Sequence, residues 1–92
     1  MEGGNYNAAI STFSTLLKRK PNSELTPHVL LRRGIAYNNM ENYSGAISDF
    51  KQILDKFGKS KYASEAFLGI REALSQANRS EEFFEIAEGY KR

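Results

Sequence analysis

The chain has 92 residues and a net charge of +2, with six phenylalanines, five tyrosines and no cysteine. That length suits one small domain, and a hydrophobic content of 40% is globular rather than disordered. The composition excludes disulfides and cysteine-based zinc sites, and no apolar run approaches the ~20 residues of a membrane span, so we expect no membrane insertion.

The first predicted helix follows Asn5, which we expect to cap its free backbone N–H groups. Apolar residues spaced by three and four line one helix face. That face comprises Tyr6, Ala9, Ile10, Phe13, Leu16 and Leu17. Pro21 is the expected stop after this helix.

The second predicted helix runs from Ser23 or Thr26 to Met40, with Ser23 as a candidate N-cap and Pro27 tolerated in the first turn. Gly34 lies inside this helix, where glycine costs about 1 kcal/mol relative to alanine. We therefore expect a compensating close approach of the next helix, with Ala46 opposite Gly34.

The third predicted helix repeats the pattern of the first. Asn42 is its expected cap and Gly58 its expected stop. Its apolar face comprises Tyr43, Ala46, Ile47, Phe50, Ile53, Leu54 and Phe57.

Two further helices complete the prediction. One spans about 60–77, and a last one spans about 80–91, with Phe83, Ile86, Ala87 and Tyr90 expected on its buried side. Five helices with short connections predict an all-α fold in which sequence neighbours pack antiparallel.

The chain nearly repeats itself at a distance of 37 residues, which indicates stacked helical repeats. "NYNAAISTF" (5–13) matches "NYSGAISDF" (42–50). Aligning the chain with itself at this offset pairs identical residues at Asn5/Asn42, Tyr6/Tyr43, Ala9/Ala46, Ile10/Ile47, Ser11/Ser48, Phe13/Phe50, Leu17/Leu54, Ser23/Ser60, Leu31/Leu68 and Ala36/Ala73.

These motifs resemble the tetratricopeptide repeat (TPR). The A-helix pattern is carried by "LLRRGIAY" (30–37), although Arg33 stands at the usual leucine, and the B-helix pattern by "NYSGAISDF". The resemblance implies an α-solenoid of antiparallel helix–turn–helix repeats in a single domain (1–92). We expect the second helix of a partial repeat at 5–21, a complete repeat at 23–58, and a degenerate or capping repeat at 60–92. In the last repeat, Arg71 and Phe83 replace the packing pair Gly34 and Ala46, which predicts a splayed or re-packed helix pair, such as a terminal cap.

The period of 37 is longer than the usual 34. This spacing resembles repeats of bacterial envelope proteins such as the periplasmic coordinator of the Tol–Pal system. The compartment is left open by the sequence, with a lean towards the bacterial periplasm or cell envelope.

Catalytic chemistry finds no support in the sequence, and we expect no enzyme activity, cofactor or metal. His28 is the only histidine and is expected in a surface role. The serines lack a visible base for a triad, and no glycine-rich phosphate loop is present. The basic residues, including Arg32 and Arg33, are interpreted as helix ends and solvated faces.

The remaining candidate function is the binding of a protein or peptide partner. In the TPR family the A helices line a concave groove. The resemblance places His28, Glu65 and Ser75 in this groove, together with the residues that we predict to bind a partner. These predicted partner-binding residues are Leu31, Arg32, Ile35, Asn38, Asn39, Leu68, Glu72 and Gln76. The two asparagines suit hydrogen bonding to a peptide backbone, and Leu31, Ile35 and Leu68 suit an apolar ligand. Alternatively, Leu31 and Ile35 pack on the A helix of a preceding repeat.

Three functions are therefore weighed. The first is a protein–protein interaction or scaffold module, part of a larger TPR protein, that binds a peptide or partner helix. The second is self-association as a homodimer that covers the unpaired first helix. RNA binding is a distant third, because the modest charge makes a nucleic-acid partner unlikely.

Overall fold

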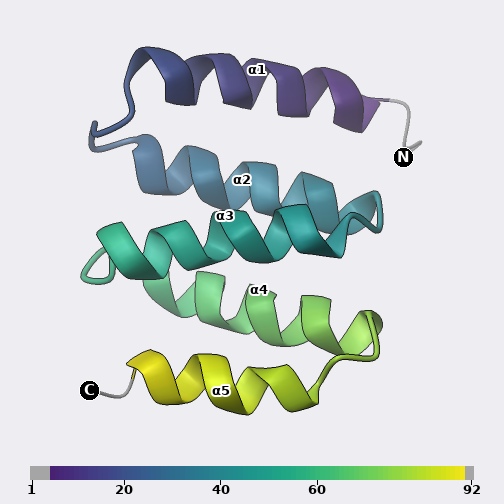
Figure 1. Ribbon diagram of the computed structural model, residues 1–92. Helices are drawn as coiled ribbons and strands as arrows, with labels where there is room; N and C mark the ends of the chain where they lie inside the picture. The colour runs from purple at the N-terminus through teal and green to yellow at the C-terminus, as the bar shows by residue number, and fades with distance from the viewer. Residues whose placement is uncertain (1–4, 91–92) are drawn as a thin grey trace.

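The computed structural model describes residues 5–90, with the side chain of Tyr90 excepted. It contains α1 (Tyr6–Arg19), α2 (Thr26–Asn39), α3 (Tyr43–Lys56), α4 (Ala63–Gln76) and α5 (Glu81–Tyr90). Figure 1 shows them as a ladder in which each helix runs antiparallel to the one before it. The all-α prediction of five helices is confirmed, with no strand among the described residues. The predicted burial of Tyr90 falls outside the described side chains.

Of the two predicted asparagine caps, only one forms. Asn42 Oδ1 accepts a hydrogen bond from the Gly45 backbone N–H at 3.1 Å, as expected. Asn5 makes no such bond. The reason is its backbone: Asn5 has helical angles (φ −91°, ψ −4°), whereas a capping residue must leave the helical region, as Asn42 does with ψ 77°.

Ser23 organises the turn before α2 rather than capping that helix, which begins at Thr26. The Ser23 backbone N–H donates to Thr26 Oγ1, and Ser23 Oγ accepts from the Leu25 backbone N–H. Thr26 Oγ1 in turn donates to the Lys20 carbonyl. These bonds connect the end of α1 to the start of α2.

The two A helices, α2 and α4, end in the same way. Glu41 and Asn78 adopt the left-handed conformation (φ 65° and 61°) and lie 37 residues apart. After α2, the Asn42 N–H bonds to the Tyr37 carbonyl and the Glu41 N–H to the Asn38 carbonyl; the same pair of bonds follows α4. This is the Schellman arrangement, and it makes the chain reverse between A and B helices.

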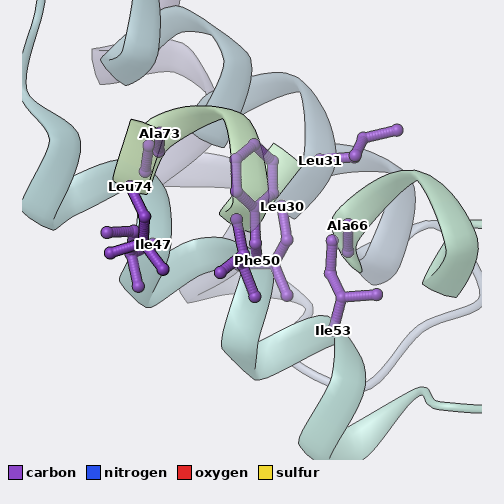
Figure 2. Packing of buried hydrophobic residues seen from close by; sticks show 10 residues of the cluster. Leu30, Leu31, Ile47, Phe50, Ile53, Ala66, Ala73 and Leu74 are labelled. Carbon is purple, nitrogen blue, oxygen red and sulfur yellow. The ribbon is translucent and has the colours of Figure 1, made fainter. Parts of the chain in front are cut away.

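The core is built around the ring of Phe50 on α3 (Figure 2). A Cβ at Gly34 of α2 would lie 2.6 Å from Phe50 Cε1, and a Cβ at Gly69 of α4 would lie 2.7 Å from Phe50 Cε2. The ring therefore fits between two glycines on different helices. The expectation that Gly34 faces Ala46 is corrected: its nearest side-chain atoms are those of Phe50, because the larger ring fills the space that both glycines leave.

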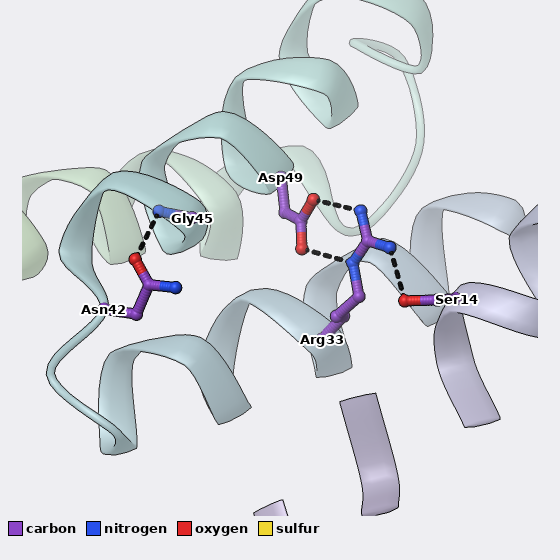
Figure 3. Close-up of polar contacts among 5 residues, drawn as sticks. All are labelled: Ser14, Arg33, Asn42, Gly45 and Asp49. Carbon is purple, nitrogen blue, oxygen red and sulfur yellow. Dashed lines mark hydrogen bonds and ion pairs between the residues drawn. The ribbon is translucent and has the colours of Figure 1, made fainter. Parts of the chain in front are cut away.

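A polar contact joins the first three helices (Figure 3). Arg33 of α2 donates two hydrogen bonds to the carboxylate of Asp49 on α3, at 2.8 and 2.7 Å, and a third to Ser14 Oγ on α1 at 2.9 Å. Asp49 is 2% exposed. The bonds to Asp49 hold the pKa of the Arg33 guanidinium above its ordinary value, although partial burial opposes this. The interpretation of Arg33 as a solvated residue is therefore wrong.

The fifth helix is more loosely attached than the others. α5 packs far less extensively on α4 than α3 does on either α2 or α4. Phe83 and Ile86 are half-buried, Phe84 is 76% exposed, and the rings of Phe67 and Phe83 meet at 5.2 Å. This agrees with the splay expected from the bulky residues at 71 and 83.

Candidate partner-binding groove

The predicted groove residues lie on α2 and α4, and these two helices contact each other across the molecule. The structure thus brings both halves of the predicted set onto neighbouring A helices. α2 carries Leu31, Arg32, Ile35, Asn38 and Asn39, and α4 carries Leu68, Glu72 and Gln76.

The three aliphatic members of the set differ in exposure. Ile35 is 45% exposed and Leu68 is 56% exposed, so both can contact a ligand. Leu31 is only 6% exposed and belongs to the same core cluster as Ala66 and Ile70 of α4. Leu31 is therefore part of the hydrophobic core and does not offer an apolar surface.

The two asparagines also differ. Asn39 is exposed at the end of α2, where its amide can donate and accept. Asn38 is half-buried, and its Oδ1 is buried with no hydrogen-bond partner among the described residues. Of the two, only Asn39 is freely available to an incoming peptide backbone.

An open hollow of ≈ 800 Å³ lies where α4 meets the start of α5. Its lining includes the predicted residues Leu68, Glu72 and Gln76, together with Phe83 and Arg71. Leu68 and Phe83 supply apolar surface, while Arg71 and Glu72 supply charge of both signs. The α4 half of the predicted set is thus gathered around a single concavity, next to the loosely packed α5.

A hydrogen-bonded chain orders the polar side of this hollow. Tyr43 Oη donates to Gln76 Oε1 at 3.2 Å, and Gln76 Nε2 donates to Glu72 Oε2 at 3.3 Å. The amide of Gln76 is therefore oriented by its neighbours. The Glu72 carboxylate keeps acceptor capacity for a donor on a ligand.

His28, at the edge of the predicted groove, has a structural contact. Its ring stacks on Tyr62 with centroids 5.0 Å apart and planes 5° apart, and Lys61 Nζ lies 5.5 Å from the centre of the Tyr62 ring. His28 thus joins the start of α2 to the start of α4. Among the described residues, no group of three or more histidine, cysteine or acidic side chains could hold a metal ion.

Sequence reasoning missed Arg71, Ser80 and Phe83 as lining residues of the hollow. The signal was present, because Arg71 and Phe83 are the two substitutions that the 37-residue offset exposes. In the structure the two residues, one from α4 and one from α5, line the same hollow.

Comparisons with known proteins agree with this architecture. Residues 28–60 match the family model described as tetratricopeptide repeat, a stretch that covers most of α2 and all of α3. No curated protein and no solved structure gives a significant match to the chain. Within the described residues, the longest apolar helical stretch falls short of a membrane span. The match spans 33 of the 92 residues, so it shows that this part of the chain is similar to the tetratricopeptide repeat family.

Proposed function

We propose that this chain is a protein–protein interaction module that binds a partner helix or peptide alongside α4, on the face formed by the A helices. The repeat itself suggests an interaction or scaffold role. The partner is a segment with an apolar face, because the exposed residues that face it include Leu68 and Ile35.

One observation carries the proposal. Leu31 and Leu68 occupy equivalent places in consecutive repeats, yet Leu31 is 6% exposed and Leu68 is 56% exposed. Leu31 shares its cluster with residues of α4, the A helix that follows α2. A helix lying beside α4, as α4 lies beside α2, would cover Leu68 in the same way.

The binding free energy gained by covering Leu68 follows from how exposed this side chain is. Full burial of a leucine side chain contributes about 1.5–3 kcal/mol, and Leu68 is more than half exposed, so about 1–2 kcal/mol remains to be gained. A charge placed at this position would remove that gain and bury an unpaired carboxylate. We therefore expect Leu68→Glu to weaken a bound partner by at least ~10-fold.

A random-peptide display library, selected on the purified chain, tests this. Peptides that survive selection are synthesised and titrated calorimetrically against the wild type, Leu68→Glu, Ile35→Glu and Leu16→Glu. The first two variants should weaken binding. Leu16→Glu is the matched control, because Leu16 is 46% exposed on α1, which is not one of the helices that form the proposed groove. Equal affinity for all variants, or no peptide above background, would refute the proposal.

The proposal extends to the arrangement of the chain. We infer one domain with a partial repeat at 5–21, a complete repeat at 23–58 and a capping repeat at 60–92. The longer period of 37 remains the basis for proposing an envelope-type repeat in a bacterial periplasmic protein. Its proposed partner-binding residues are the exposed members of the groove set, Arg32, Ile35, Asn39, Leu68, Glu72 and Gln76. Secretion of a reporter fused to the full reading frame would test the compartment.

A second candidate function is self-association through α1. None of its residues is buried, whereas Ile47 and Phe50, the α3 equivalents of Ile10 and Phe13, are buried. Apolar faces of this kind commonly find a partner. Sedimentation equilibrium of the wild type and Ile10→Glu tests it: a concentration-dependent dimer lost in the variant supports self-association, and a monomer at millimolar concentration excludes it.

A further inference from the structure

A second hollow lies away from the A-helix groove, between the two B helices α1 and α3 and next to the start of α2. Its volume is ≈ 600 Å³. Below it is called the α1–α3 hollow, and the residues that matter for its chemistry are Ser14 and Lys18 of α1, Arg33 of α2, and Gln52 and Lys56 of α3.

The charge of the α1–α3 hollow has one sign. Lys18, Arg33 and Lys56 line it, and none of its lining residues within the described chain is acidic. Asp49 neutralises Arg33 but is itself 2% exposed and does not line the hollow. Neither lysine has an ion-pair partner among residues 5–90.

The helix ends reduce this charge without cancelling it. Lys18 and Lys56 lie in the last turns of α1 and α3, and each helix C-terminus carries about −0.5 of an elementary charge. The α2 N-terminus, whose Thr26 also lines the hollow, contributes about +0.5. When these partial charges of the helix ends are added to the charges of the two lysines, the hollow has a net charge of about +1.5.

Uncharged donors lie in the same place. Ser14 Oγ accepts its hydrogen bond from Arg33 Nη1, so the hydroxyl hydrogen of Ser14 is left to donate elsewhere. The carboxamide of Gln52 is half-buried and has two N–H donors. Cationic and neutral donors around a concave, partly enclosed space are the arrangement that oxyanions require.

The next repeat provides an internal comparison, because a smaller hollow of ≈ 500 Å³ lies between α3 and α5. Its lining includes Asp55, which is the 37-residue equivalent of Lys18, as well as Glu85 and Lys51. Two acidic residues and one basic residue make the hollow between α3 and α5 mixed in charge. The positive charge of the α1–α3 hollow is therefore a property of its own residues and not of the fold.

We propose that the α1–α3 hollow binds a phosphate-class oxyanion, held by Lys18 and Lys56 with Ser14 and Gln52 as neutral donors. Such a group is either free inorganic phosphate or the phosphorylated side chain of a peptide. The site is on the B helices, so it is independent of the groove proposed above.

NMR titration of the ¹⁵N-labelled chain with inorganic phosphate, at ionic strength held constant with sodium chloride, tests the proposal. We expect saturable shifts of backbone amides within 11–18 and 52–57. Lys18→Asp, which introduces the residue found in the next repeat, should weaken binding by about 10-fold or more. Lys59→Asp is the control, because it changes the net charge equally at an exposed position outside the hollow.

A parallel titration with capped phosphoserine separates the two sources. Tighter binding than inorganic phosphate identifies a phosphorylated side chain, and weaker binding identifies the free ion. Shifts that spread over the whole chain without saturation, or equal weakening by Lys18→Asp and Lys59→Asp, would overturn the proposal. Circular dichroism of each variant confirms that both remain folded, as exposed substitutions should.

Discussion

The two glycines that flank Phe50 allow a sharp test of the packing. Helix propensity alone predicts that Gly34→Ala stabilises the protein by about 1 kcal/mol. The new Cβ would lie 2.6 Å from Phe50 Cε1 and 2.9 Å from Cζ. The ring also lies so close to Gly69 that a Cβ built there would fall 2.7 Å from Cε2, which limits how far the ring can move away from Gly34. Overpacking of this kind costs about 1–3 kcal/mol. We expect a net destabilisation of about 1 kcal/mol.

The same substitution should change sign when the ring is removed. In a Phe50→Leu background the added methyl group meets a smaller and more adaptable side chain, so Gly34→Ala should be neutral or stabilising by up to about 1 kcal/mol. Urea unfolding followed by circular dichroism at 222 nm gives all four free energies of the double-mutant cycle. Gly89→Ala is the control, because nothing lies within 4 Å of a Cβ there.

Two results would refute this reasoning. The first is a Gly34→Ala variant that is more stable than the wild type, since propensity would then outweigh the contact. The second is an unchanged cost in the Phe50→Leu background, because the destabilisation would then come from something other than the ring.

Three further predictions follow from the polar contacts and turns. Arg33→Ile should destabilise the protein by about 3–5 kcal/mol in urea unfolding, because it leaves Asp49 buried and unpaired, and Arg33→Ile/Asp49→Ile should recover most of the loss. Glu41→Gly should raise the free energy of unfolding by about 1 kcal/mol, because Glu41 has φ 65°, and an unchanged melting temperature would contradict this. The hydrogen bond from Arg79 holds the pKa of Glu82 below its ordinary value of 4.5. The stability that this bond contributes to α5 is therefore present above pH 4.5 and is lost as the pH falls through the folded-state pKa of Glu82. The protection factors of α5 amides, which are corrected for the intrinsic exchange rate at each pH, should therefore fall in acid, and Arg79→Met should remove that fall.

The sequence predicted the helices because each of them is amphipathic and the pattern occurs twice. Periodicity located α1 and α3 within one or two residues, and Asn42 marked a true helix start. The periodicity could not predict which residues contact each other in the core. Gly34 was recognised as unusual, but only the fold shows that Phe50 is its neighbour and that Gly69 contacts the same ring.

Long-range polar contacts were the other omission. Arg33 and Asp49 are 16 positions apart, and nothing in their local sequence distinguishes them from solvated charges. Leu31 illustrates the same limit for the groove, because whether an aliphatic residue on an A helix is covered depends on the next A helix. The exposure of Leu68 and the burial of Leu31 follow from their places in the stack and not from their identity.

The bond between Arg33 and Asp49 also bears on how a chain of near-copies avoids assembling out of order. At the 37-residue offset the place of Asp49 is taken by Thr12 in α1, and the place of Arg33 by Ile70 in α4. If α1 docked where α3 belongs, Arg33 would face a threonine, and if α3 took the place of α5, Asp49 would be set against Ile70. Either exchange would bury an unpaired charge, at a cost of about 3–5 kcal/mol. This single ion pair therefore discriminates between B helices that share most of their apolar residues, and a variant with isoleucine at both positions should refold with more domain-exchanged oligomers.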